Sequence, residues 1–217
     1  MKIVIQCAGR KRPDASHLRD ANGRPILFVA KPDIAPETPN FHHAHPDDIN
    51  LDGISWRDQL IEINKNPKNN PLNLSTAGSL YLPLAYRNLI AKFGKDQIYI
   101  LSAGWGLIAS DFLTPAYDIT FSQSAEAYKH RRKKDHYNDF TMLKSNTDEP
   151  VIFLGGKDYI PLFCKLTSHI TNQRIVVYNS GIPPDPPGCN ILRYHTSTRT
   201  NWHYQCAQAI IDNKFSG

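Results

Sequence analysis

Two carboxylates and two aromatic side chains follow one apolar segment of the sequence. Residues 98–101 read as a buried strand, and a single predicted loop after it contains Trp105, Asp111, Tyr117 and Asp118. Carboxylates can deprotonate water or stabilise a developing positive charge. Each Asp could instead be solvated or cap a helix, and the two aromatic rings could belong to the core or to a surface lid. The order of these residues predicts a ligand site at a strand end.

Two other apolar segments are followed by small and cationic residues in the same way. Residues 2–7 and residues 151–154 read as buried strands, and a glycine-containing loop follows each of them. The strand at residues 2–7 is followed by Ala8, Gly9, Arg10, Lys11 and Arg12. The strand at residues 151–154 is followed by Gly155, Gly156, Lys157, Asp158 and Tyr159. The strand at residues 98–101 is followed by the small residues Ser102, Ala103 and Gly104. Backbone N–H groups in such loops can face an anion, although a Gly-Gly pair is often only a turn. Because loops after parallel strands gather at one sheet edge, we expect the three loops to share one cleft.

The remaining pattern alternates strands and helices. Strands are expected at residues 174–178 and 190–193. Helices are expected over 55–66, 79–93, from 122 or 124 to 143, over 157–171, and from about 199 onward. Residues 31–53 and 179–188 are rich in proline and are predicted to be long loops. The alternation predicts one α/β domain over residues 1–217, with three α/β/α layers and a mostly parallel central sheet.

Composition limits the classes of protein that fit. The 217 residues are 41% hydrophobic, and the sequence contains neither a long apolar run nor a secretory leader pattern, so we expect a cytoplasmic protein without a membrane partner. Four widely spaced cysteines fit neither a disulfide framework nor a zinc site. His42, His43 and His45 lack the spacing of a helical ligand pair. We therefore expect reduced thiols, no metal and no cofactor.

Positive charge is concentrated in three stretches. Lys and Arg number 25 against 20 Asp and Glu, a net charge of +5, and the cations gather at residues 10–12, 129–134 and 193–203. Such patches suit a polyanion, although a run of charge can also be a solvated helix face. Residues 199–204 combine cationic, polar and aromatic groups at a predicted helix start. That combination suits stacking and phosphate contact, or else simply a capped helix with a half-buried Trp.

Three blocks of the sequence resemble one family. SAGWGLIASDFLTPAYDITF (residues 102–121), LGGKDYIPL (154–162) and the segment from Cys7 to Lys11 are similar to the YaaA-like proteins, although Trp105 stands where many relatives carry Tyr. That group is associated with DNA binding and peroxide stress, and related domains have the uracil-DNA-glycosylase-like fold. The resemblance implies that fold, a DNA partner that is either duplex or single-stranded, and base removal. The oligomeric state stays open.

Hydrolysis of an N-glycosidic bond passes through a positively charged sugar, which a carboxylate can stabilise while it activates water. Asp118 is the first candidate and Asp111 the second, with Trp105 and Tyr117 as walls for an extruded base. The other expected substrate-binding residues are Cys7, Gly9, Arg10, Lys11, Ser102, Gly104, Gly155, Gly156, Lys157 and Tyr159. The expected nucleic-acid-binding residues are Arg12, Arg131, Arg132, Lys133, Lys134, Arg199, Asn201, Trp202 and His203.

The leading hypothesis is therefore a DNA glycosylase, which we expect to act on a modified base and to serve in anti-phage defence. A non-catalytic DNA-binding stress protein is the first alternative. An N-glycosidase for free nucleosides or nucleotides is the second, and it would not need the basic stretch at residues 129–134.

Overall fold

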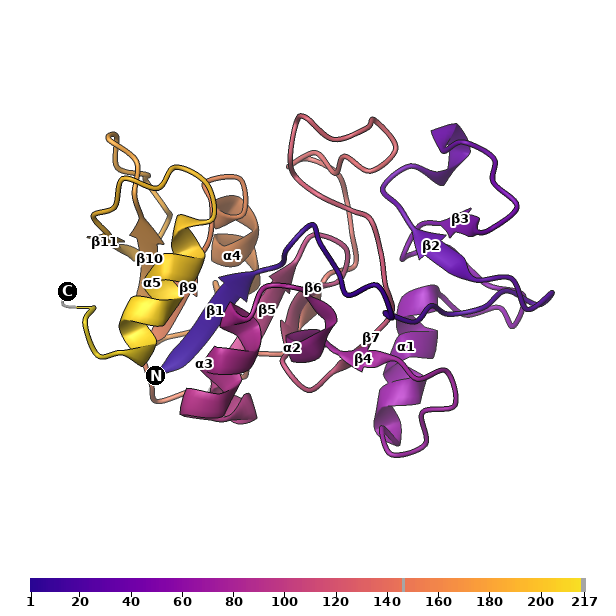
Figure 1. Ribbon diagram of the computed structural model, residues 1–217, viewed down its shortest axis with the longest axis horizontal. Coiled ribbons are helices and arrows are strands. Elements are labelled where there is room, and N and C mark those ends of the chain that lie inside the picture. Colours follow the sequence, from indigo (N-terminus) through magenta and orange to yellow (C-terminus); the bar gives the residue numbers. More distant parts are fainter. Residues whose placement is uncertain (146, 216–217) are drawn as a thin grey trace.

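The computed structural model describes residues 1–145 and 147–215. Within these residues, seven strands form a central sheet in the order β11-β10-β9-β1-β5-β6-β8 (Figure 1). The strands are β1 (Lys2–Gln6), β5 (Ile98–Ser102), β6 (Gly106–Ala109), β8 (Phe140–Thr141), β9 (Val151–Leu154), β10 (Arg174–Tyr178) and β11 (Asn190–Arg193). The predicted mixed α/β architecture with a mostly parallel sheet is confirmed.

The middle of the sheet is built from the most apolar strands. β1 pairs in parallel with β5 on one side and with β9 on the other, and β9, β10 and β11 continue the parallel arrangement. Ile3, Val4 and Ile5 of β1 are fully buried, as expected for a strand covered on both faces. Since β1, β5 and β9 run in the same direction, their carboxyl ends lie at one edge of the sheet.

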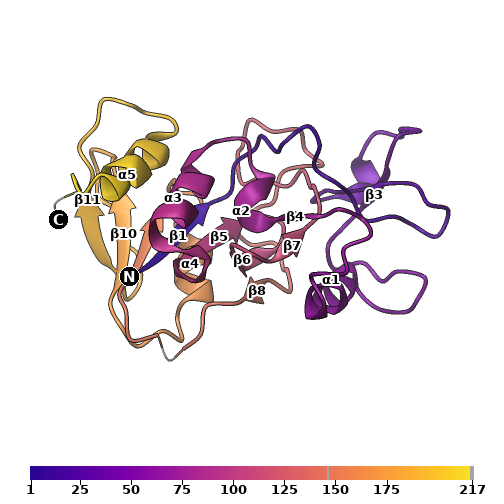
Figure 2. The ribbon, with the colours of Figure 1, turned by 60° about the horizontal axis from the view of Figure 1, so that its bottom comes forward.

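Helices cover both faces of this sheet. Helices α3 (Ala85–Phe93) and α5 (Trp202–Ile211) pack against each other on one face, and α4 (Ile160–Leu166) lies on the other (Figures 1 and 2). Gly94 ends α3 with a φ of 85°, a positive value that favours glycine. The predicted helix over 157–171 is shorter than expected, with Pro161 in its first turn.

Two further helices precede β5 in the chain. Helix α1 (Trp56–Lys65) begins at Ser55, whose side chain accepts a hydrogen bond from the N–H of Asp58, as predicted. The predicted helix over 79–93 is in fact two helices, α2 (Ala77–Leu80) and α3. Tyr81 takes an extended conformation between them, two residues before Pro83, which lacks an N–H for a continuing helix.

The predicted basic helix from residue 122 or 124 to 143 is wrong. This stretch consists of turns and bends that end in β8, and Thr120 forms a β-bridge with His130. Helical periodicity fails because Arg131 turns inward, where its side chain is 3% exposed. The charge run therefore does not present one continuous cationic face.

The loop predicted after residue 101 is partly wrong as well. The chain reverses at once, and β6 pairs antiparallel with β5, with Ser102 opposite Gly106. Gly106 has a φ of +89°, and a Cβ there would lie 2.6 Å from the carbonyl oxygen of Phe140. A tight hairpin that needs glycine therefore replaces the first part of the expected loop.

Residues 13–76 form an annex beside the sheet, at the right of Figure 1. Here β2 (Ile26–Phe28) pairs in parallel with β3 (His42–Ala44), and β4 (Ser75–Thr76) pairs with β7 (Leu113–Thr114). The predicted loop over 31–53 thus contains a strand and a short 3-10 turn at Pro32–Ile34, whereas residues 179–188 are irregular as predicted. Across residues 1–145 and 147–215, no helix has the length and apolar character needed to cross a membrane.

Candidate functional site

A cavity of about 720 Å³ opens at the carboxyl ends of β1 and β9. Four chain segments line it, and they come from distant parts of the sequence. The lining residues are Gln6, Cys7 and Gly9; Thr120, Phe121, Ser122, Gln123 and Lys133; Gly156, Lys157, Asp158 and Tyr159; and Arg199, Thr200, Asn201, Trp202 and His203. The predicted meeting of the loops after β1 and β9 is therefore confirmed, and the start of α5 joins them.

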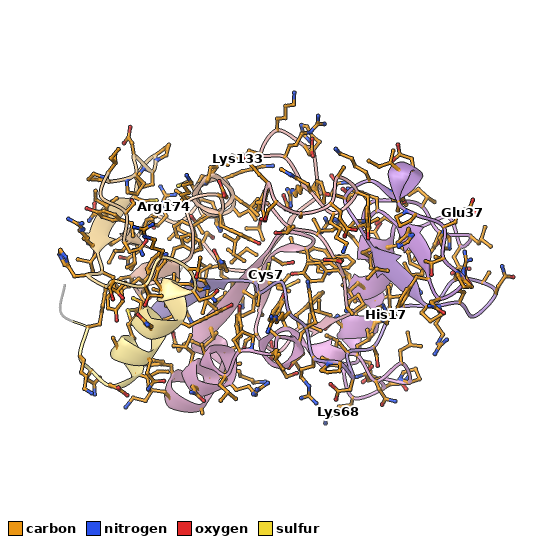
Figure 3. All side chains as sticks on the ribbon, turned by 45° about the horizontal axis from the view of Figure 1, so that its top comes forward. Cys7, His17, Glu37, Lys68, Lys133 and Arg174 are labelled. Atoms are coloured by element: carbon orange, nitrogen blue, oxygen red, sulfur yellow. The ribbon has the colours of Figure 1, made fainter. Side chains whose placement is uncertain are left out.

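Direct hydrogen bonds hold the two strand-end loops together. The Oε1 of Gln6 accepts a bond from the N–H of Gly156 at 2.6 Å, and the Sγ of Cys7 lies 3.2 Å from the hydroxyl of Tyr159. A Cβ on Gly155 would lie 2.3 Å from the ring of Phe153, so glycine is required for this close approach. Cys7, near the centre of Figure 3, is 4% exposed and places a thiol at the cavity wall.

The third expected loop lies behind this wall. The Ser102 hydroxyl donates to the Tyr117 hydroxyl at 2.8 Å and accepts from the N–H groups of Gly104 and Trp105. Ser102 and Trp105 are 0% exposed and Tyr117 is 2% exposed. The expectation that Trp105 and Tyr117 wall a base pocket is therefore wrong, because both rings are core side chains. Among the described residues, Ser102 and Gly104 likewise stay out of the cavity lining.

Asp111 does not lie at the sheet edge where the loops after β1 and β9 meet. The β5–β6 hairpin carries the chain back along β5, so the N–H of Ser110 bonds the carbonyl of Ile98 at the opposite end. There the Asp111 carboxylate is exposed and forms an ion pair with Lys95 at 3.0 Å. The structure therefore contradicts Asp111 as a partner of the loops after β1 and β9.

Asp118 lies beside the cavity. Its carboxylate is 36% exposed and forms an ion pair with Lys129 at 2.8 Å. Partial burial opposes protonation of Lys129, but the bonds to Asp118 and Glu126 dominate and raise its pKa. Thr120, two residues further along, reaches the lining, whereas within the described chain Asp118 is not part of it. Asp118 thus faces a neighbouring cation instead of the hollow itself.

Lys11 connects this carboxylate with the buried tyrosines. Its Nζ lies 4.1 Å above the centre of the Tyr117 ring and 3.3 Å from the carbonyl oxygen of Gly9. Burial lowers the pKa of Lys11, while the charges of Cys7 and Asp118 act in the opposite direction. The Tyr117 hydroxyl in turn lies 2.8 Å from that of Tyr81. A polar network therefore underlies the loop after β1.

Asp158 is a cavity-lining carboxylate that sequence reasoning missed. It follows the Gly-Gly turn after β9, and its side chain is 36% exposed and 3.1 Å from the Nζ of Lys133. The residues around it had been interpreted as an anion-binding turn, which drew attention to Lys157. The available signal was an Asp that follows a buried strand within four residues.

Aromatic side chains form part of the cavity wall. The rings of Phe121 and Tyr159 meet edge to face with centroids 5.0 Å apart. Trp202, at the start of α5, is 5% exposed and stacks near Tyr194. Phe121 escaped the sequence analysis because it ends the predicted loop. These side chains supply flat apolar surface of the kind that a planar ligand requires.

The basic stretch at residues 129–134 contributes Lys133 to the cavity lining among the described residues. Arg131 is buried and donates two hydrogen bonds to Asp139, and Arg132 pairs with Asp135. Lys134 is exposed. The expectation that Arg131 contacts nucleic acid is therefore wrong, because its guanidinium belongs to the core.

The first cationic cluster also contributes little to the cavity. Arg10 is exposed, and Arg12 forms an exposed ion pair with Asp14. Among the described residues, neither of these arginines lines the cavity. Lys157 and Arg199, in contrast, stand at its wall together with Lys133. Positive charge therefore reaches the cavity from the β9 loop and the segment before α5.

The start of α5 lies at the cavity wall, and Asn201 precedes it without a side-chain capping bond. Asn201 has a φ of 59°, and the N–H groups of the first turn of α5 begin at the cavity wall. Such N–H groups attract anions. His203 is 3% exposed, and burial lowers its pKa to about 4, so its imidazole is neutral at pH 7.

The described residues, 1–145 and 147–215, contain no group of three or more His, Cys, Asp or Glu side chains arranged to hold a metal ion. The three histidines of the annex have separate partners. His42 bonds Asp20, while His43 contacts Tyr128 and His45 contacts Tyr137 through their rings.

A family model matches residues 72–182, which is slightly more than half of the chain and spans β5, β6 and β9. Comparison with curated proteins found no match, and comparison with solved structures found none either. The family is described as one of unknown function. The matched segment supplies two of the four cavity walls, those formed by residues 120–133 and 156–159. The chain belongs to this family of unknown function, DUF6884.

Proposed function

We propose that this protein is a DNA glycosylase, which hydrolyses the N-glycosidic bond of a base held in the cavity. The observation that carries the proposal is one cavity that combines the Asp158 carboxylate, the Phe121 and Tyr159 rings and the cations Lys157 and Arg199. A volume of about 720 Å³ is ample for one nucleotide. These are the groups that a flipped nucleotide needs, namely a carboxylate near the sugar, flat walls and phosphate contacts.

Asp158 is the better-placed carboxylate for the reaction. Departure of the base leaves positive charge on the sugar, and a carboxylate at the cavity wall can stabilise that charge and accept a proton from the attacking water. The ion pair with Lys133 orients the Asp158 side chain. Asp118 is the second candidate, since it would have to leave Lys129 to reach the hollow.

The leaving base carries negative charge that N–H donors can stabilise. The first turn of α5 brings such donors to the cavity wall, whereas the N–H of Gly156 is already bonded to Gln6. We further propose kinship with the YaaA-like proteins and the uracil-DNA-glycosylase-like fold. Its support is that the strand-end segments after β1 and β9, which carry two of the three similar blocks, meet at this cavity.

A free nucleotide is the second candidate substrate. The observation in its favour is the pairing of the basic stretch, where Lys129, Arg131, Arg132 and Lys133 all contact carboxylates. Cations that are already paired contribute less to binding along a polymer, because each contact with a phosphate would first break an internal ion pair. A mononucleotide needs only the cations at the cavity wall.

The test is incubation of the protein with single-stranded and duplex oligonucleotides that carry assorted modified bases, followed by alkali to reveal abasic sites. Parallel reactions contain the corresponding free nucleotides, with base release measured by chromatography. We expect Asp158→Asn to lower the rate by about 100-fold or more, the usual contribution of a general base. Asp111→Asn, at the opposite sheet edge, serves as the matched control and should retain wild-type activity.

The outcomes separate the candidates. Strand cleavage with oligonucleotides supports the glycosylase, and base release from nucleotides alone supports the second candidate. An equal loss of activity in Asp111→Asn and Asp158→Asn would contradict the assignment of the reaction to this cavity. Binding without base release from any substrate would leave a non-catalytic DNA-binding protein and refute the proposed reaction.

A further inference from the structure

Two cysteines outside the cavity lie close together. The Sγ atoms of Cys164 and Cys189 are 3.8 Å apart, although the residues are 25 positions apart in the sequence. Cys164 is buried in α4, and Cys189 is partly exposed directly before β11. Both are free thiols in the structure. We infer that Cys164 and Cys189 form a reversible disulfide that ties α4 to the edge strand β11.

Arg174 of β10 holds both cysteine-bearing segments in place. Its Nη2 donates to the carbonyl oxygen of Gly188 at 2.9 Å, and its Nη1 donates to that of Cys164 at 3.5 Å (Figure 3 labels Arg174). Gly188 has a φ of +66°, and a Cβ there would lie 2.5 Å from Nη2. A side chain at position 188 would therefore displace the guanidinium, so the glycine preserves the approach of the two thiols.

The loop before Cys189 limits its freedom further. Prolines 183, 184, 186 and 187 fix the backbone, and the N–H of Cys189 donates to the carbonyl of Pro186 at 3.1 Å. A disulfide needs the sulfurs about 2.05 Å apart, so they must approach further. Because Cys189 is at the edge of the sheet and partly exposed, a small movement there suffices.

The exchange reaction can be written with a small-molecule disulfide as the oxidant. The Cys189 thiolate attacks one sulfur of oxidised glutathione, forming a mixed disulfide and releasing one glutathione thiolate. The Cys164 thiolate then attacks the Sγ of Cys189 and releases the second. The pair loses two electrons and two protons, and oxidised glutathione gains them as two thiols. Burial, and next the neighbouring Cys189, raise the pKa of Cys164, so Cys164 is not the thiol that attacks glutathione first.

The test uses the folded wild-type chain equilibrated in glutathione buffers of increasing oxidised fraction. Acid quenching, alkylation and mass spectrometry count the free thiols and identify cross-linked peptides. We expect the loss of two thiols, a mass lower by about 2 Da, a peptide joining Cys164 to Cys189, and full reversal by dithiothreitol. Cys206→Ala, which removes a fully buried cysteine of α5, is the matched control and should form the same cross-link.

Two variants extend the test. Cys164→Ser should retain glutathione on Cys189 and lose the cross-link, and Arg174→Met should slow cross-linking about tenfold, since orientation of the thiols is lost. Glutathione adducts without the Cys164–Cys189 peptide in the wild-type chain would overturn the inference. So would cross-linking that appears only after denaturation. Both refuting results come from the wild-type protein and need no variant to fold.

Discussion

Replacement of Arg131 by glutamine should destabilise the fold, even though the residue lies in a run of cations. Its guanidinium donates to Asp139 at 2.9 and 2.6 Å and to the carbonyl oxygen of Ala103 at 2.8 Å. It also lies 3.7 Å from the centre of the Tyr137 ring. The side chains of Arg131 and Asp139 are 3% and 2% exposed, so removal of the cation leaves a buried carboxylate without its charge partner.

Loss of one partner from a buried ion pair costs about 3–5 kcal/mol in the free energy of unfolding. With a urea slope of about 2 kcal/mol per M, the midpoint of urea unfolding should fall by about 1.5–2.5 M. Arg132→Gln is the matched control, because the neighbouring side chain is 54% exposed and its surface ion pair is worth about 1 kcal/mol at most. Circular dichroism during urea titration measures both.

The double variant Arg131→Met and Asp139→Leu should recover part of the lost stability, because apolar side chains fill the same space without a buried charge. The reasoning would be refuted if Arg131→Gln unfolded at the wild-type urea concentration. A selective loss of DNA affinity in that variant, with unchanged stability, would show that Arg131 faces a ligand, as the sequence alone had suggested.

Three further predictions concern stability. Tyr117→Phe should cost about 1–2 kcal/mol in urea unfolding, because it removes the hydroxyl that bonds Ser102; unchanged stability would contradict the buried network. Gly106→Ala should lower the free energy of unfolding by more than about 2 kcal/mol, because the new Cβ would meet the Phe140 backbone. Gly23→Ala is the control, since Gly23 has a φ of +77° and open space around it, and it should lower the free energy by about 1 kcal/mol. Equal losses of stability in the two variants would contradict this reasoning. The pKa of His203 in the folded protein is about 4, below the ordinary value of 6.5. Its contribution to the free energy of unfolding is therefore full above pH 6.5 and is lost as the pH falls toward 4. Because of His203, the free energy of unfolding should be about 2 kcal/mol lower at pH 5 than at pH 7. His203→Gln should reduce this difference in urea unfolding measured at the two pH values. An unchanged difference in the variant would contradict the burial of a neutral imidazole.

The parts of the fold that could be predicted are those in which local pattern and burial agree. β1, β5 and β9 are short apolar runs and mostly buried strands, and β10 is buried at its two valines. Their parallel order then placed the loops after β1 and β9 at one edge. Ser55 likewise allowed the start of α1 to be predicted, because its side-chain oxygen caps the helix.

The failures arose where a tertiary contact outweighed the local pattern. The basic run looked helical because the sequence does not reveal that Asp139 draws Arg131 inward. The β5–β6 hairpin was hidden because Gly104, within the turn, was interpreted as a ligand-binding glycine, and the positive-φ residue Gly106 was not recognised as part of a hairpin. That one turn moved Asp111 to the far edge and buried Trp105, so an error in local structure became an error in the candidate site.

Binding of a phosphate-bearing ligand to the cavity is the most direct test of the account. Fluorescence anisotropy with a labelled oligonucleotide that contains an abasic-site analogue would compare the wild type with the double variant Lys157→Glu and Arg199→Glu. Both side chains stand at the cavity wall, so affinity should fall about tenfold or more, while Arg12→Glu, outside the described lining, should change it little. Equal affinity of the wild type and the Lys157–Arg199 double variant would contradict the claim that this cavity binds the ligand.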